Sequence, residues 1–165
     1  MLVIGIDPGT ATTGYGLVRE ERDGSLAVVD YGVVLTSPDF PMPERLLEMY
    51  RRLKEILLLH RPESGAVEKL FFARNSRTAI SVGQGRGVAM LALAEAGMPV
   101  AEYTPMEVKQ AVAGYGGADK TQIQEMVRLL LGMGSIPKPD DAADALAVAI
   151  CHLHFSRTQA LLNSS

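Results

Sequence analysis

Two acidic residues, Asp7 and Glu68, each follow a short run of apolar residues. Asp7 comes after residues 2–6 and Glu68 after residues 65–67, and both runs are typical of buried strands. A carboxylate at the edge of a hydrophobic core must be solvated, paired with a cation or bound to a metal ion. Because ligands of α/β sheets bind outside the carboxyl ends of the strands, we expect both carboxylates to belong to one site.

Two further aspartates, Asp141 and Asp144, are spaced i, i+3 in a segment with helical character, so they share a helix face. The neighbouring alanines allow the backbone of this helix to approach the sheet closely. Asp140 or Asp141 has an alternative role as a helix N-cap, which is a common position for aspartate. The same alternative is weaker for Asp144, which lies beyond the cap.

Carboxylates from three separate segments, without an accompanying His/Cys cluster, favour Mg²⁺ or Mn²⁺ over zinc. Two such ions about 3.5–4 Å apart would activate a water molecule and stabilise the departing 3′ oxygen of a phosphodiester. We therefore expect Asp7, Glu68, Asp141 and Asp144 to be metal ligands first and proton acceptors second.

The elements that must position these side chains alternate along the chain. Apolar and β-rich runs predict strands, and helical periodicity and capping signals predict helices, including a capping box at Thr104 to Glu107. In one helix we expect Leu46, Leu47, Tyr50, Leu53 and Leu57 to form the buried face. The predicted strands are 2–6, 14–18, 27–35, 65–68 and 99–103, and the helices after the first are 77–96, one from Thr104, 120–131 and 140–154. This order predicts an α/β fold with a mixed five-stranded sheet and helices on both faces.

The composition predicts one domain. The chain has 165 residues, 47% of them hydrophobic, and we assign residues 1–157 to the domain and 158–165 to a short disordered tail. A formal charge of −3 argues mildly against a general nucleic-acid coat protein, which is usually strongly basic. No apolar stretch approaches the length of a membrane span, so we expect a soluble, cytoplasmic protein with no membrane partner. Cys151, His60, His152 and His154 are expected to be structural, because a lone Cys/His pair has too few ligands for zinc.

At these residues the chain resembles the RuvC family of Holliday-junction resolvases. Five ordered blocks carry the resemblance: IGIDPGTATTGYG at 4–16, VEKLFFARN at 67–75, GQGRGV at 83–88, VKQAVAGYGGADKTQIQ at 108–124 and DDAADALAVAI at 140–150. The resemblance implies a ribonuclease H-like fold and a four-carboxylate site at Asp7, Glu68, Asp141 and Asp144, with spacing that favours Asp141 over Asp140. It implies an endonuclease that resolves four-way DNA junctions by paired symmetric nicks, using Mg²⁺ at two ions per subunit, for which Mn²⁺ substitutes.

The resemblance also implies a homodimer, a branch-migration motor as partner, and a set of DNA contacts. Lys109 and Lys120 match lysines near the cleaved phosphate, where an ammonium would neutralise developing charge, and Lys120 is included among the catalytic residues. Phe71 matches an aromatic residue inserted at the junction centre. Without the resemblance, solvated lysines and a buried Phe71 would be the better interpretation. The remaining residues expected on the DNA-binding surface are Arg74, Asn75, Arg77 and Arg86.

A four-way junction has approximate two-fold symmetry, so a dimer with two sites would suit it. Gly83 and Gly87 are our candidate interface, since their spacing permits close contact; packing of this helix against its own sheet is the alternative. Two other functions stay open. One is a nucleotide-binding protein of the actin-like or sugar-kinase ATPase type, and the other is a junction-binding protein without cleavage activity.

Overall fold

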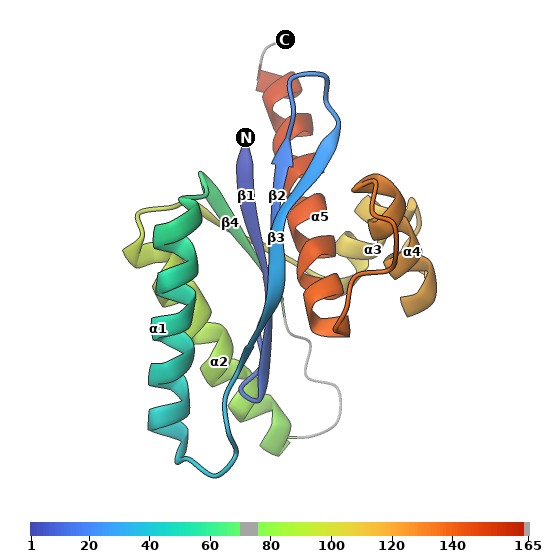
Figure 1. The fold of residues 1–165 in the computed structure, drawn as a ribbon. Coiled ribbons are helices and arrows are strands. Elements are labelled where there is room, and N and C mark those ends of the chain that lie inside the picture. Colours follow the sequence, from blue (N-terminus) through green and yellow to red (C-terminus); the bar gives the residue numbers. More distant parts are fainter. Residues whose placement is uncertain (70–75, 164–165) are drawn as a thin grey trace.

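The computed structural model describes residues 1–69 and 76–163, and its centre is one five-stranded sheet (Figure 1). The strand order is β3-β2-β1-β4-β5. Strands β1, β2 and β3 are successively antiparallel, whereas β4 runs parallel to β1 and β5 parallel to β4. The strands are β1 (Leu2–Asp7), β2 (Thr12–Glu20), β3 (Leu26–Leu35), β4 (Ser64–Glu68) and β5 (Val100–Tyr103). The predicted mixed sheet is confirmed.

Helices cover both faces of the sheet (Figure 1). One face carries α1 (Met42–His60) and α2 (Ser76–Glu95), and the other carries α5 (Asp140–Asn163) with α3 (Pro105–Ala113) and α4 (Lys120–Leu130) outside it. Each face has its own hydrophobic cluster, one against α5, α3 and α4 and one against α1 and α2. This is the ribonuclease H-like arrangement that the resemblance implied.

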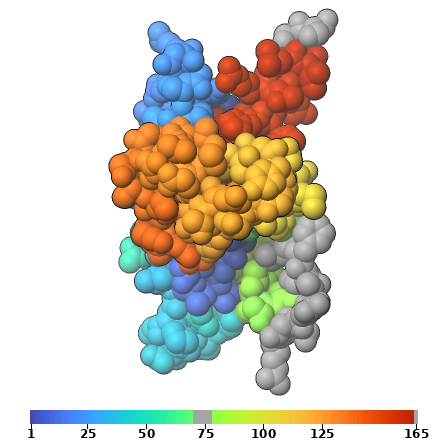
Figure 2. Space-filling view, turned by 90° about the vertical axis from the view of Figure 1, so that its right-hand side faces the viewer, coloured from blue at the N-terminus to red at the C-terminus, as the bar shows by residue number. Residues whose placement is uncertain are grey.

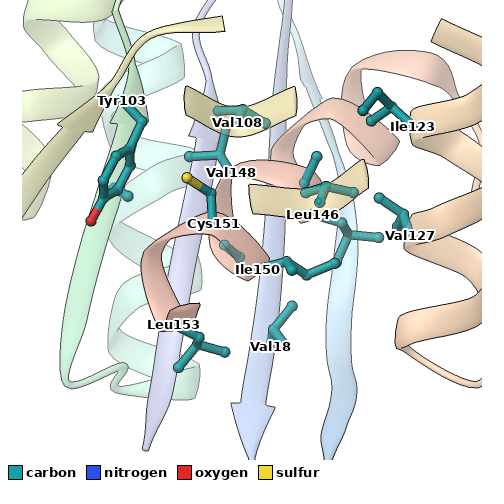
Figure 3. Packing of buried hydrophobic residues seen from close by; sticks show 14 of the residues in the cluster. Val18, Tyr103, Val108, Ile123, Val127, Leu146, Val148, Ile150, Cys151 and Leu153 are labelled. Atoms are coloured by element: carbon teal, nitrogen blue, oxygen red, sulfur yellow. The ribbon is translucent and has the colours of Figure 1, made fainter. Parts of the chain in front are cut away.

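Helix α5 lies very close to the sheet because glycines face it. A Cβ atom added at Gly5 would lie 2.2 Å from the carbonyl oxygen of Ala145, and one at Gly16 would lie 2.8 Å from Leu146. Leu146 and Ile150 are fully buried against this face, beside Val18 of β2 (Figure 3). Small residues on both sides therefore set the depth at which α5 packs.

Two details differ from the sequence-based expectations. In α1 the buried residues are Met49, Leu53 and Leu57, whereas Leu47 is 46% exposed, because the i, i+4 stripe runs through Met49 rather than Leu47. Helix α5 ends at Asn163 and not near His154, because it continues past the sheet beside the β2–β3 turn, where Arg157 pairs with Glu20. The division at residue 157 stays a prediction.

Cys151 and His152 lie in the interior of the fold. His152 is 7% exposed and bridges the hydroxyl groups of Ser64 and Tyr103, each at 2.9 Å. Cys151 is buried, and burial raises the pKa of its thiol to about 12. These contacts support the expected structural roles of His152 and Cys151.

None of the helices in residues 1–69 and 76–163 combines the length and hydrophobicity that crossing a bilayer requires.

Candidate active site

Asp7 and Glu68 end two neighbouring parallel strands. The β1–β4 register pairs Ile6 with Val67, so the next residue on each strand is one of these acids. Both side chains are therefore carried to the same edge of the sheet, at the carboxyl ends of the strands, as the sequence predicted. The adjacency rests on long-range pairing that no local pattern records.

Helix α5 brings the aspartate pair to this edge. Gly14, the partner of Asp7 on β2, faces the start of α5, and an added Cβ there would lie 1.9 Å from the carbonyl oxygen of Asp141. Asp141 and Asp144 are half-buried, three residues apart on the helix. Each acts electrostatically on Asp7. The structure thus gathers the four predicted carboxylates around one sheet edge.

Burial and mutual repulsion dominate the electrostatics of these acids. Burial, then the negative charges of Glu68, Asp144 and Asp141, raise the pKa of Asp7 from 3.8 to about 7. Burial and Asp144 raise the pKa of Glu68 from 4.5 to about 6, against the opposing effect of Lys109 and Lys120. Burial also raises the pKa of Asp144 despite the attraction of Lys120. The site carries more buried negative charge than its lysines neutralise.

The two predicted lysines line a pocket together with two of the four acids. A cavity of about 200 Å³ is bounded by Glu68, Asp144, Lys109 and Lys120, with apolar side chains of α3, α4 and α5 completing its wall. The ammonium Nζ of Lys120 lies 3.3 Å from Oδ2 of Asp144. In Figure 2, α3 and α4 are nearest the viewer, with α2 visible below them. Two cationic side chains therefore lie beside two of the carboxylates.

The donor chemistry of this site suits a divalent metal ion. As the side chains stand in residues 1–69 and 76–163, no three of the His, Cys, Asp and Glu side chains converge closely enough to form a metal site. The available donors are carboxylate oxygens, which Mg²⁺ and Mn²⁺ prefer. Burial and the neighbouring acids raise the pKa values of Asp7 and Glu68, and a divalent cation would offset the repulsion among these carboxylates. We conclude that the residues fit such an ion.

Asp140 differs from its neighbours and is not a helix cap. Helix α5 begins at Asp140 itself, and the carbonyl group of Pro139 accepts the first hydrogen bonds of the helix. The Asp140 carboxylate instead contacts Gln124, Lys138 and Lys120. Hydrogen bonds from Gln124, Lys138 and Lys120, in that order, lower its pKa. The choice of Asp141 over Asp140 as a ligand stays a prediction, and no local sequence pattern indicates the contacts of Asp140.

Of the other residues predicted to contact DNA, the structure describes the side chain of Arg86 alone. Phe71, Arg74 and Asn75 lie outside the described residues, and for Arg77 only the backbone, in the first turn of α2, is described. Arg86 forms an ion pair with Glu102 of β5, and its Nε is buried without a hydrogen-bond partner among the described residues. The sequence does not predict this ion pair, because a charged residue on an edge strand does not indicate which helix packs across that strand.

The glycines of α2 do not pack against the chain's own sheet. Within residues 1–69 and 76–163, a Cβ atom added at Gly83 or Gly87 would meet no atom within 4 Å. Ile80 and Leu91 lie on the same helix and are 66% and 61% exposed. The alternative that close packing on the sheet explains this spacing is therefore wrong.

The fold and its carboxylate site define a nuclease of the ribonuclease H-like class. The family model described as "Crossover junction endodeoxyribonuclease RuvC" matches residues 3–152. A crossover junction endodeoxyribonuclease RuvC from Syntrophomonas wolfei is 55% identical and covers 100% of this chain and 95% of its own. The chain belongs to the RuvC family.

Solved structures agree with this assignment. RuvC of Thermus thermophilus superposes with a TM-score of 0.90 at 43% identity, covering 96% of this chain and 97% of its own. The same protein in complex with a Holliday junction substrate gives a TM-score of 0.88 at 40% identity, with 96% of each chain covered. Membership of a nuclease family that uses divalent metal ions decides against the ATPase alternative.

Proposed function

We propose that this chain is an endonuclease of DNA recombination and repair that resolves four-way junctions by paired symmetric nicks. The observation that carries the proposal is that Asp7, Glu68, Asp141 and Asp144 lie at one edge of the sheet, where Glu68 and Asp144 share a pocket with Lys109 and Lys120. Acidic and basic side chains at one edge suit hydrolysis of a phosphodiester, since the acids hold cations and the lysines attract the anionic backbone. Family membership supports the junction as substrate.

The chain's own residues have separate tasks in this mechanism. Asp7 and Glu68 are held by the sheet, whereas Asp141 and Asp144 are held by α5, so two rigid elements fix the ligand geometry. Bound divalent cations would supply the Lewis acid that activates water and stabilises the departing 3′ oxygen. Lys120, beside Asp144, is placed to neutralise charge that develops on the phosphate.

The ion assigned to this site is Mg²⁺, at two ions per subunit, with Mn²⁺ as a substitute. An all-carboxylate donor set supports this choice over zinc, and the number of acids supports two ions rather than one. Because Asp7 and Glu68 have pKa values of about 7 and about 6, both would lose their protons as the cations bind.

A homodimer would place two such sites on the two-fold symmetric junction. Its proposed interface is the exposed face of α2 formed by Ile80, Gly83, Gly87 and Leu91. The two glycines leave open space above the backbone, and the two large apolar side chains flank them. A second copy of α2 would bury this face. A branch-migration motor as partner and a cytoplasmic location follow from family membership as further proposals.

The proposed DNA-binding surface extends from the two lysines toward the start of α2. The position of Lys109 and Lys120 in the pocket with Glu68 and Asp144 supports their assignment to this surface. For Phe71, Arg74, Asn75 and Arg77 the assignment stays a prediction from the family resemblance. Arg86 would have to exchange Glu102 for a phosphate oxygen in order to contribute.

Amide variants test the ligand assignment and the non-catalytic alternative together. Asp7→Asn, Glu68→Gln, Asp141→Asn and Asp144→Asn should each lower the rate of junction cleavage by about 100-fold or more. Junction binding in EDTA should persist, because removing an acid does not weaken contacts to phosphate. The control is Asp23→Asn in the β2–β3 turn, where the carboxylate contacts only Ser25 and its own backbone. Cleavage by Asp7→Asn at the wild-type rate would show that the metal-site assignment is wrong.

A further inference from the structure

Lys120 is shared between the carboxylate site and an acid outside it. Its Nζ lies 3.3 Å from Oδ2 of Asp144 and 3.4 Å from Oδ2 of Asp140. The two aspartates are four residues apart on α5, so they lie one above the other on the face toward α4. Only Asp144 belongs to the proposed ligand set.

Asp140 is held in place by a second residue of α4. The side-chain amide of Gln124 donates a hydrogen bond to Oδ1 of Asp140 at 3.0 Å, and Gln124 is only 7% exposed. Lys138 donates to the same oxygen at 3.3 Å. Because Oδ1 has two donors, Oδ2 is left facing Lys120. Helices α4 and α5 thus meet through two matched i, i+4 pairs, Lys120 with Gln124 and Asp140 with Asp144.

Engagement of Asp144 by a divalent cation would change the balance between these two aspartates. An ammonium group is repelled by a cation on the same carboxylate, so the attraction between Lys120 and Asp144 weakens. Asp140 accepts hydrogen bonds from Gln124 and Lys138 and is not one of the proposed metal ligands. Its negative charge therefore remains available to attract Lys120. The lysine then has one acidic partner instead of two.

We propose that Asp140 is a positioning residue that keeps the ammonium group of Lys120 beside the carboxylate site while Asp144 is engaged by metal. The inference rests on the proposed function and adds a residue to its machinery. Asp140 itself touches neither the metal nor the phosphate. Without it, the flexible side chain of Lys120, which is half exposed, would sample many rotamers and lose its alignment with the reacting phosphate.

Simple electrostatics makes the opposite prediction for the same residue. An acid on a DNA-binding face repels phosphate, so its removal should strengthen junction binding and leave the chemical step unchanged or faster. A positioning role predicts slower cleavage with binding unchanged or tighter. The rate of the chemical step and the binding constant must therefore be measured separately.

The test uses Asp140→Asn in the full-length protein, because Asn keeps an oxygen acceptor for Gln124 but removes the charge. Single-turnover cleavage of a synthetic four-way junction in Mg²⁺ should be about tenfold slower. The Kd for the uncleaved junction, measured in EDTA, should be unchanged or lower. In a Lys120→Ala background the substitution should have no further effect on the rate, because Asp140 acts through that lysine.

Glu125→Gln is the matched control, because Glu125 is an acid of α4 that pairs with Arg128 and not with Lys120. It should cleave within about twofold of the wild-type rate. A wild-type cleavage rate in Asp140→Asn would overturn the inference, and so would an equal loss in the presence and absence of Lys120. If the wild-type protein fails to cleave the junction at all, the proposed function is wrong; if it cleaves and Asp140→Asn cleaves equally well, only the positioning role is wrong.

Discussion

Asp7→Asn should make the metal-free protein more stable although it removes cleavage. The pKa of Asp7 rises from 3.8 to about 7 in the folded chain, chiefly because the carboxylate is buried. A shift of that size corresponds to about 4 kcal/mol of destabilisation when the group is charged, at 1.36 kcal/mol per pKa unit. Because Asp7 keeps partial contact with solvent, we expect about 1–2 kcal/mol in practice. For a chain of this length that gain raises Tm by about 3–8 °C.

The pH dependence of this gain has a definite sign. Since the folded-state pKa is raised, the folded chain binds the proton more tightly, and the penalty grows as pH rises from 3.8 toward 7. The penalty is largest at pH 8 and is smaller at pH 5. Thermal unfolding in EDTA, followed by circular dichroism at both pH values, measures the difference. Two results would contradict this origin of the penalty. One is an Asp7→Asn variant with no higher Tm than the wild type at pH 8, and the other is a Tm difference between the two proteins that is the same at pH 5 as at pH 8.

Three further substitutions or conditions give independent outcomes. Gly14→Ala should lower stability by about 1–3 kcal/mol and slow cleavage, because the new methyl group collides with the carbonyl oxygen of Asp141; an unchanged Tm would contradict this contact. Gly87→Arg should yield folded monomers by sedimentation equilibrium, since the side chain fills the proposed interface, whereas a persistent dimer would place the interface elsewhere. Mn²⁺ affinity, measured by calorimetry, should fall about 20-fold between pH 8 and pH 6, because protons on Asp7 and Glu68 compete with the ion; a constant affinity would exclude that competition.

The parts of the fold that sequence could predict were those with strong local signals. The apolar run before Asp7 and the one before Glu68 end at strand ends, and Thr104 caps α3 through a capping box with Glu107. Each signal lies within a few residues, where strand burial and helix capping are decided. Their sequence-based assignments are confirmed.

The contacts that sequence could not predict depend on how distant segments meet. The side chain of Lys120 lies between Asp140 and Asp144 only because α4 packs on α5. The pairing of Arg86 with Glu102 likewise depends on α2 crossing β5. In α1, the predicted buried face included Leu47, which is exposed, and omitted Met49, which is buried. Residues two positions apart on a helix point in different directions, so a small error in the predicted stripe changes which side chains are buried.

Cleavage of a synthetic mobile four-way junction, with each strand end-labelled in turn, tests the central claim most directly. The protein is incubated with the junction or with a linear duplex of matched sequence, in Mg²⁺, Mn²⁺ or EDTA, and the cuts are mapped on denaturing gels. The carboxylate site and the family predict paired, symmetric nicks in the junction alone, and only when a divalent ion is present. Binding without cuts, cuts in EDTA, or equal cutting of the duplex would contradict the claim that this site is a metal-dependent junction nuclease.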